Sequence, residues 1–224
     1  MSIKDFEQRV LDQQAVDAEH YNSEYFTGEW RSDGNNYSLE TRRKIEGKNP
    51  SLIKEVFQPN KVLDLGCGPG ALMHLLLELD VSCDGIDFSE SSKKLATPEA
   101  REKITVGQVT DLTLKPENSY DLVVCREVLE HLTVLQVRQT VKNIVRMTSR
   151  FAYVTTRFHP APSGLLDFTT QFEVDPSHIT LLNKDLLRLF FVLDGCRSRP
   201  DLEARMDWGN KGRVIVVEKI KSDT

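Results

Sequence analysis

Short apolar runs alternate with amphipathic segments along most of the chain. Runs typical of buried strands lie at 61–65, 81–86, 104–106, 122–125 and 151–156, and the fully apolar run 122–125 is typical of a central strand. Between them, apolar residues recur at helical spacing at 52–57, 71–79 and 134–145, and a polar, helical link is expected over 91–102. Because strands and helices alternate, the pattern predicts an α/β fold in which helices cover both faces of a parallel sheet.

The C-terminal end of this pattern is different. Asn183 can cap a helix that runs to Val192, and two further strands are expected over 197–203 and 213–220. The segment 208–212 between them is too short to hold a crossover helix, which a parallel connection requires. We therefore expect the last two strands to pair antiparallel, as a terminal hairpin.

Residues 1–48 are polar and highly charged, and aromatic residues are spaced through them. Two interpretations fit this pattern. The segment is either a helical extension whose aromatic residues pack on the main domain, or a lid over a binding site. We therefore divide the chain into an N-terminal extension or lid (1–48) and a main domain (49–224). The aromatic residues are Phe6, Tyr21, Tyr25, Phe26, Trp30 and Tyr37.

Composition excludes several classes of protein. The 224 residues include 29 Lys and Arg and 34 Asp and Glu, for a formal net charge of -5, so nucleic acid is an improbable partner. The first residues lack the apolar core of a secretory signal, and the longest apolar runs fall well short of a membrane span. The four cysteines form no CxxC pair. These features predict a cytoplasmic protein with reduced thiols and no membrane association.

The most informative segment is the sequence VLDLGCGPG at 62–70, where a buried strand runs into a glycine-rich turn and then a helix. Glycines permit positive φ angles and let a ligand approach backbone N–H groups closely. A turn at the carboxyl end of a strand is where open α/β sheets bind ligands. The spacing is G-x-G-x-G, which differs from the G-x-G-x-x-G of dinucleotide sites and argues against an NAD-dependent oxidoreductase.

Acidic residues follow the next two strands. Asp87 ends the second strand, where a carboxylate can accept hydrogen bonds from both hydroxyls of a ribose. Asp111 follows the third strand and can accept a hydrogen bond from an adenine amino group. Two carboxylates without Lys or Arg in the cradle disfavour a phosphate ligand. They predict a nucleoside that carries positive charge.

A second group of polar residues follows the fourth strand, in the sequence REVLEHL at 126–132. If this segment is helical, Glu127, Glu130 and His131 lie on one face. Together with His178 they can bind a divalent cation. Alternatively, the acids orient His131 and raise its pKa, so that it acts as a general base with Glu127 beside it. His159 is the second candidate for the base. Without a metal, the histidine would orient a substrate or the acids would cap a helix.

The segments VLDLGCGPG, GIDFS, QVTDL and YDLVVCREVLEHL resemble the ordered motifs of class I S-adenosylmethionine-dependent methyltransferases. The resemblance extends over 49–220. It implies a Rossmann-like, doubly wound, seven-stranded and mostly parallel sheet with a reversed C-terminal strand. It also implies S-adenosylmethionine as cofactor, with Asp64 holding the glycine loop and the amino group, the loop near the methionine part, Asp87 on the ribose and Asp111 on the adenine. The expected cofactor contacts are Asp64, Gly66, Cys67, Gly68, Gly70, Asp87, Phe88, Asp111, Leu112, Cys125 and Arg126.

The E-x-x-E-H element with a later histidine is similar to two subfamilies, the ubiquinone-biosynthesis O-methyltransferases and the small-RNA 2′-O-methyltransferases. We therefore expect methyl transfer to a hydroxyl or amine of a small metabolite, with a divalent metal as a possible second cofactor. Two other functions stay open, a small-RNA 2′-O-methyltransferase and a non-catalytic regulator that binds an adenosyl ligand. The sequence does not decide between a monomer and a homodimer.

Overall fold

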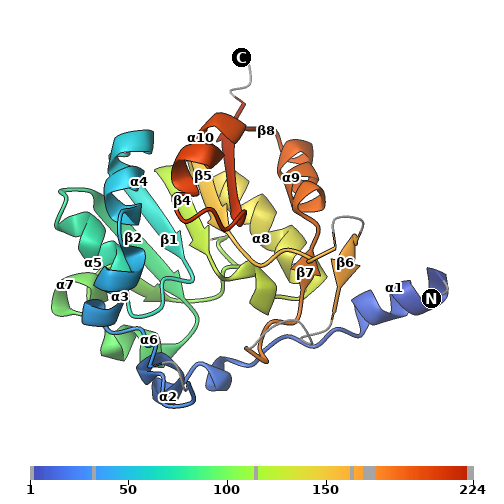
Figure 1. The fold of residues 1–224 in the computed structure, drawn as a ribbon, viewed down its shortest axis with the longest axis horizontal. Coiled ribbons are helices and arrows are strands. Elements are labelled where there is room, and N and C mark those ends of the chain that lie inside the picture. Colours follow the sequence, from blue (N-terminus) through green and yellow to red (C-terminus); the bar gives the residue numbers. More distant parts are fainter. Residues whose placement is uncertain (1–2, 32–33, 114–115, 162–163, 169–174, 221–224) are drawn as a thin grey trace.

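The structure is a computed structural model that describes residues 3–31, 34–113, 116–161, 164–168 and 175–220. Within these residues, a seven-stranded sheet has the order β3-β2-β1-β4-β5-β9-β8 (Figure 1). Neighbouring strands are parallel except where β9 pairs antiparallel with β5 and β8. The strands are β1 (Lys61–Leu65), β2 (Ser82–Asp87), β3 (Ile104–Val106), β4 (Tyr120–Arg126), β5 (Thr148–Thr155), β8 (Cys196–Ser198) and β9 (Val214–Lys219). The expected mostly parallel sheet with a reversed C-terminal strand is confirmed.

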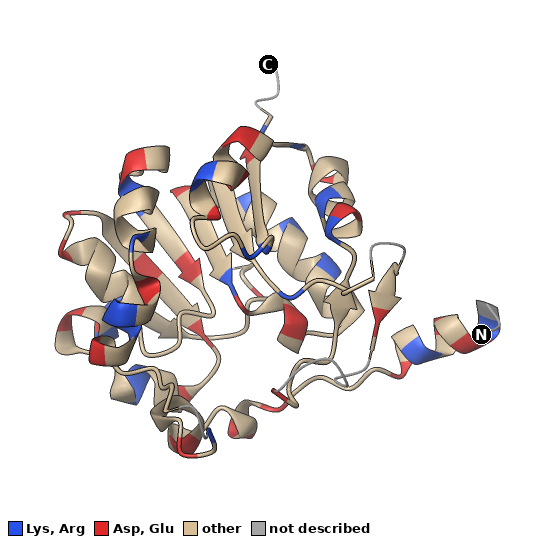
Figure 2. Ribbon diagram, viewed as in Figure 1, with Lys and Arg blue, Asp and Glu red and all other residues tan. Residues whose placement is uncertain are grey.

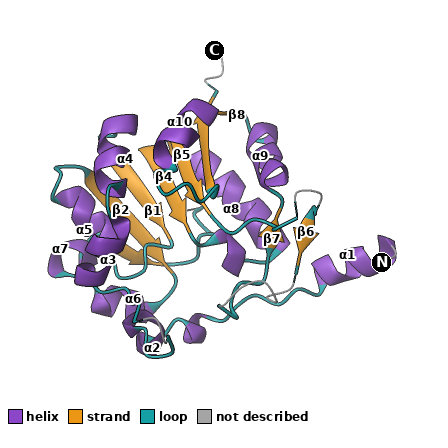
Figure 3. Ribbon diagram, in the orientation of Figure 1, coloured by secondary structure: helices purple, strands orange, loops and turns teal. Residues whose placement is uncertain are grey.

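Helices cover both faces of this sheet (Figure 3). In β4, Leu122 and Val124 pack into one core cluster, whereas Val123 and Cys125 pack into the other, as the alternation of a strand between two layers requires. The first cluster includes α4 (Asn49–Phe57), α5 (Ala71–Leu77) and α10 (Pro200–Met206), and the second includes α8 (Val134–Met147) and α9 (Lys184–Leu193).

The remaining described elements include three helices of the N-terminal segment, two 3-10 turns and a separate pair of short strands. The N-terminal segment holds α1 (Ile3–Leu11), α2 (Ser23–Thr27) and α3 (Leu39–Glu46). A 3-10 turn (Ala18–His20) precedes α2, and a second one (Leu129–His131) follows β4. Two small strands, β6 (Leu166–Asp167) and β7 (Leu181–Leu182), form a separate pair that the hydrophobic pattern did not predict.

Two expectations about secondary structure are wrong, and a proline explains each. The expected strand 197–203 ends at Ser198, because Pro200 starts helix α10 at a position where its missing N–H costs no hydrogen bond. The expected helical link 91–102 is split into α6 (Glu90–Leu95) and α7 (Pro98–Arg101), because the residue before a proline is driven out of the helical region. The cap at Asn183 is confirmed, since its side chain accepts hydrogen bonds from the N–H groups of Asp185 and Leu186.

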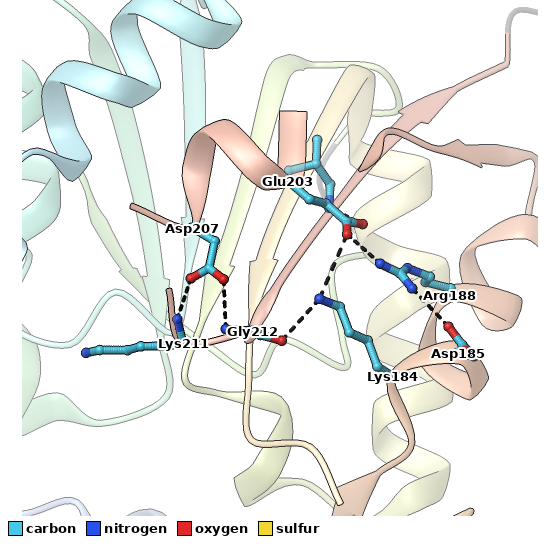
Figure 4. Close-up of polar contacts among 8 residues, drawn as sticks. Lys184, Asp185, Arg188, Glu203, Asp207, Lys211 and Gly212 are labelled. Carbon is cyan, nitrogen blue, oxygen red and sulfur yellow. Dashed lines mark hydrogen bonds and ion pairs between the residues drawn. The ribbon is translucent and has the colours of Figure 1, made fainter. Parts of the chain in front are cut away.

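A polar network fixes helix α10 against α9 and β9 (Figure 4). One carboxylate oxygen of the buried Glu203 accepts a hydrogen bond from Arg188 at 2.5 Å, and the other accepts one from the main-chain N–H of Val216 at 3.3 Å. Lys184 lies 3.9 Å from the same carboxylate and donates to the carbonyl of Gly212 at 3.1 Å. The network therefore links three elements around the reversed strand.

We predict that Glu203→Gln lowers the free energy of unfolding by about 2 kcal/mol, because it removes the buried counter-ion of Arg188 and leaves only the exposed Asp185 as its ion-pair partner. Urea denaturation would measure the change. The matched control is Glu55→Gln, which removes an exposed ion pair between Glu55 of α4 and Arg205 of α10. This variant should lower the free energy of unfolding by less than about 1 kcal/mol. Equal losses in the two variants would contradict the prediction.

Candidate active site

The glycine-rich turn after β1 has the backbone geometry that the sequence predicted. Gly66 and Gly68 have φ angles of 71° and 52°, in the left-handed region that other residues rarely adopt. A Cβ atom on Gly66 would also lie only 2.3 Å from a methyl carbon of Val128, so no larger side chain fits there. The turn therefore brings β1 and the segment after β4 into close contact at the carboxyl edge of the sheet.

Asp87 is held in place by this turn. One of its carboxylate oxygens accepts a hydrogen bond from the N–H of Gly68 at 2.9 Å, and the other accepts one from the N–H of Ser89 at 2.9 Å. Burial raises the pKa of Asp87, and the two backbone N–H groups act against this shift. Asp64 is also buried, and burial raises the pKa of its carboxyl group to about 7, although the nearby Arg126 acts in the opposite direction.

A cavity of about 610 Å³ extends from the glycine turn to the segment after β4. Most of the predicted site residues line it, but the side chain of Asp111 hydrogen-bonds to Thr113 and lies outside the lining. Leu112 and Cys125 lie in the hydrophobic core, and Gly70 packs against Ala100. At the end of β3, the lining residues are Gln108, Val109 and Thr110. The predicted residues that line the cavity are Asp64, Gly66, Cys67, Gly68, Asp87, Phe88, Arg126, Glu127, His131 and His178.

The N-terminal segment forms one wall of this cavity. Tyr21, Tyr25 and Phe26 are buried in one cluster, against which Phe88 of the main domain packs. The side chain of Gln13 holds the preceding stretch, because it donates to the carbonyl of Ile179 at 2.8 Å and accepts from the N–H of Val134 at 2.9 Å. Tyr21, Tyr25 and Phe26 therefore pack against the main domain and also line the cavity.

A buried ion network that the sequence did not reveal joins the N-terminal segment to β4. Glu46 of α3 is only 3% exposed, and its two carboxylate oxygens lie 2.6 Å from Arg126 and 3.0 Å from Arg42. Burial alone would lower the pKa of Arg126, but the carboxylate of Glu46 beside it raises that pKa above its ordinary value. Arg126 is thus held in a buried ion pair with Glu46. Arg126, Glu46 and Arg42 all line the cavity.

The segment after β4 is not the helix that was considered. Glu127 has a φ of 53°, in the left-handed region, and a single 3-10 turn follows at Leu129–His131. As a result, the carboxylate of Glu127 points to Arg157, at 3.6 Å, and Arg213, at 3.8 Å. The structure separates Glu127 from the other three acidic and histidine residues of this group, because a left-handed residue redirects the chain between them.

Glu130, His131 and His178 do come together. One potential ligand atom from each lies within 4.8 Å of the others. Glu130 is fully buried, and one of its oxygens accepts a hydrogen bond from the hydroxyl of Thr156 at 2.8 Å, while the other has no hydrogen-bond partner among the described residues. Burial, with the charge of Glu127, raises the pKa of Glu130 well above its ordinary value.

The electrostatics of His131 differ from the expectation. Burial, together with the neighbouring His178, lowers its pKa to about 3, whereas a raised pKa was expected from the adjacent acids. The raised pKa of Glu130 favours its uncharged form, which does not stabilise a protonated His131, and Glu127 lies outside the cluster. His159 does not line the cavity, and its ring hydrogen-bonds to the main chain of Ala161.

Comparisons with known proteins agree with this geometry. Residues 62–150 match the family model described as a methyltransferase domain. A ubiquinone biosynthesis O-methyltransferase from Rickettsia canadensis is 37% identical over 89 residues, which are 38% of this chain and 37% of that relative. The match therefore covers little more than a third of the relative's length.

Two solved structures share the fold. An S-adenosylmethionine-dependent methyltransferase from Archaeoglobus fulgidus has a TM-score of 0.65 at 16% identity, over 87% of this chain and 99% of its own. The magnesium protoporphyrin IX methyltransferase of Synechocystis, solved with bound S-adenosylmethionine, has a TM-score of 0.59 at 17% identity, over 93% and 100%. Motif order, strand order and the family match agree: residues 62–150 match a methyltransferase domain, and the chain has the fold of S-adenosylmethionine-dependent methyltransferases.

Proposed function

We propose that this protein transfers the methyl group of S-adenosylmethionine to a hydroxyl group of a small metabolite. The observation that carries the proposal is the continuity of one cavity, which joins the Gly66–Gly68 turn and Asp87 to His131 and His178. A cofactor bound at the first end would point its reactive group toward the second. The family match supports the chemistry, and the name of the O-methyltransferase relative supports oxygen as the acceptor.

The cofactor's parts have matching partners in this proposal. Asp87, preorganised by the N–H groups of Gly68 and Ser89, would accept hydrogen bonds from the ribose hydroxyls. Asp64 would face the ammonium group of the methionine part, since it is a buried carboxyl group beside the glycine turn. Residues 108–110 would take the adenine in place of Asp111, which is not part of the cavity lining and accepts a hydrogen bond from Thr113.

Methyl transfer makes modest chemical demands. The acceptor oxygen attacks the methyl carbon, the carbon–sulfur bond breaks, the sulfonium becomes a neutral thioether and the hydroxyl loses its proton. The rate then depends on alignment of the two reactants and on removal of that proton. The N-terminal segment, which we propose acts as a lid, would exclude water and hold the reactants together, because Tyr21, Tyr25 and Phe26 form part of the wall.

Glu130, His131 and His178 fit a divalent cation. Glu130 has a buried oxygen without a hydrogen-bond partner among the described residues, and one of its oxygens lies within 4.8 Å of a ring nitrogen of each histidine. A carboxylate with neutral histidines is a common ligand set. A pKa of about 3 keeps His131 neutral at physiological pH, which suits a ligand better than a general base. A bound cation would lower the pKa of an acceptor hydroxyl. We propose these three residues as the metal ligands, without Glu127.

A small acceptor is favoured over RNA because basic residues of α8 are bound to other groups of the protein. Figure 2 shows basic positions along α8, where a phosphate backbone could in principle bind. Arg138 of this helix is paired with Asp194, and Arg146 donates to the carbonyl of Leu112. None of the described helices is long and apolar enough to cross a membrane.

We predict that Asp87→Ala weakens the binding of S-adenosylhomocysteine about 100-fold, because two hydrogen bonds from ribose hydroxyls to a charged group are lost. Isothermal titration calorimetry would measure the dissociation constant. Asp111→Ala is the matched control, and we expect a change of less than about two-fold. A large loss in Asp111→Ala with none in Asp87→Ala would contradict the proposed placement of the cofactor.

Binding of S-adenosylhomocysteine should release protons near pH 6. With a pKa of about 7, Asp64 is mostly protonated at this pH in the free protein, and a bound ammonium group favours its ionised form. Above pH 8 the carboxyl group is already ionised, so the release should vanish. Calorimetry in buffers of different ionisation enthalpy would count the protons. Equal release in wild type and Asp64→Asn would assign it to another group.

The metal proposal predicts that the wild-type protein binds about one Mn²⁺ ion, that chelation removes methyl transfer and that added Mn²⁺ restores it. Glu130→Gln should abolish binding, as followed by electron paramagnetic resonance of the free ion. The control Glu127→Gln should bind Mn²⁺ like the wild type, because Glu127 lies outside the cluster. Full turnover after exhaustive chelation would exclude a role for the metal.

A further inference from the structure

The ring of His131 is hydrogen-bonded on the side that carries Nδ1. Nδ1 lies 2.9 Å from the hydroxyl oxygen of Ser177. That hydroxyl in turn donates to one carboxylate oxygen of Asp175 at 2.6 Å, and the main-chain N–H of Ser177 donates to the same oxygen at 2.9 Å. Ser177 and Asp175 are both buried, so water does not compete for these contacts.

Asp175 is ionised in this arrangement. Burial acts to raise its pKa, but the two hydrogen bonds from Ser177 act against burial, and the pKa of Asp175 lies below its ordinary value. Its second oxygen accepts a hydrogen bond from the hydroxyl of Tyr25, at 3.3 Å, in the N-terminal segment. An ionised carboxylate can only accept hydrogen bonds. The single hydroxyl proton of Ser177 is therefore directed to Asp175.

The protonation of His131 follows from this count of donors. Because the proton of Ser177 is used, its oxygen can only accept from Nδ1, and Nδ1 must carry a hydrogen. We propose that Asp175 and Ser177 are positioning residues that hold His131 as the Nδ1–H tautomer and leave the lone pair of Nε2 for the cluster with Glu130 and His178. The use of this lone pair rests on the function proposed above, whereas the tautomer does not.

The same contacts connect the histidine to the N-terminal segment. The hydroxyl of Tyr25 donates a hydrogen bond to the second carboxylate oxygen of Asp175. The ring of Tyr21 contacts the ring of His131 edge-on, at a centroid distance of 5.7 Å. The ligand geometry of His131 thus depends on two segments that are far from it in the sequence. Outer hydrogen-bond partners of this kind set both the tautomer and the ring orientation of metal-binding histidines.

Nitrogen NMR of the metal-free protein tests the tautomer directly. In protein labelled with ¹⁵N-histidine, long-range proton–nitrogen correlations distinguish Nδ1–H from Nε2–H, and His131→Gln assigns the signals. We expect only Nδ1–H in the wild type. In Ser177→Ala the Nε2–H form should appear and Mn²⁺ affinity should fall about 10-fold. Ser177→Thr, which keeps the hydroxyl, should restore both.

Ser149→Ala is the matched control, because it removes a half-buried hydroxyl that donates to the carbonyl of Tyr120, away from the cavity. This variant should change neither the tautomer of His131 nor the Mn²⁺ affinity. If Ser177→Ala does not fold, Asp175→Ala frees the Ser177 proton to point at Nδ1 and should also produce Nε2–H.

The proposal is overturned if His131 is the Nε2–H tautomer in the wild type. It is also overturned if Ser177→Ala keeps only Nδ1–H, or if Asp175→Ala does so when Ser177→Ala does not fold. It also fails if the tautomer changes while Mn²⁺ affinity does not. A wild type that holds Nδ1–H but binds no Mn²⁺ would instead contradict the metal ligands proposed above and, with them, the proposed use of the Nε2 lone pair.

Discussion

The strand order of the sheet turns around between β1 and β4, and the site depends on this constraint. The chain runs outward from β1 to β2 and β3, and then returns to place β4 on the other side of β1. The connections after β1 and β4 therefore leave the carboxyl edge in opposite directions and open a crevice between them. Gly66 and Val128 meet at this point, so close that only a glycine fits. Asp64, Asp87 and Arg126 are all brought to the crevice by these strands.

Burial of charge is the second feature that shapes the site. Asp64, Glu130 and Arg126 are removed from water, which costs free energy unless each group finds a partner. Arg126 has Glu46, but one oxygen of Glu130 has none among the described residues. A buried carboxyl group without a partner is unfavourable in its ionised form, and a cationic ligand can supply the missing charge. The same burial makes His131 a neutral ring and Asp64 a group that titrates near neutral pH.

The N-terminal segment gives these groups their enclosure. Its contacts combine an aromatic cluster, the ion pair from Glu46 to Arg126 and the hydrogen bond from Tyr25 to Asp175. Each of these contacts reaches a different part of the crevice. The position of this segment is thus coupled to the cofactor end, to β4 and to the histidine cluster, which supports its proposed role as a lid.

The sequence by itself determined the sheet, its reversed last strand and the glycine turn, because strand periodicity and glycine conformations are local properties. It also placed Asp87 at the end of the second strand, where the structure has it. Only the tertiary structure decided that Asp111 lies outside the cavity lining, that a left-handed Glu127 leaves the acidic cluster, and that Glu46, Asp175 and Ser177 join the site. It also decided the low pKa of His131, which depends on burial. Contacts between distant segments and the loss of water around a charge leave no periodic signal in a single sequence.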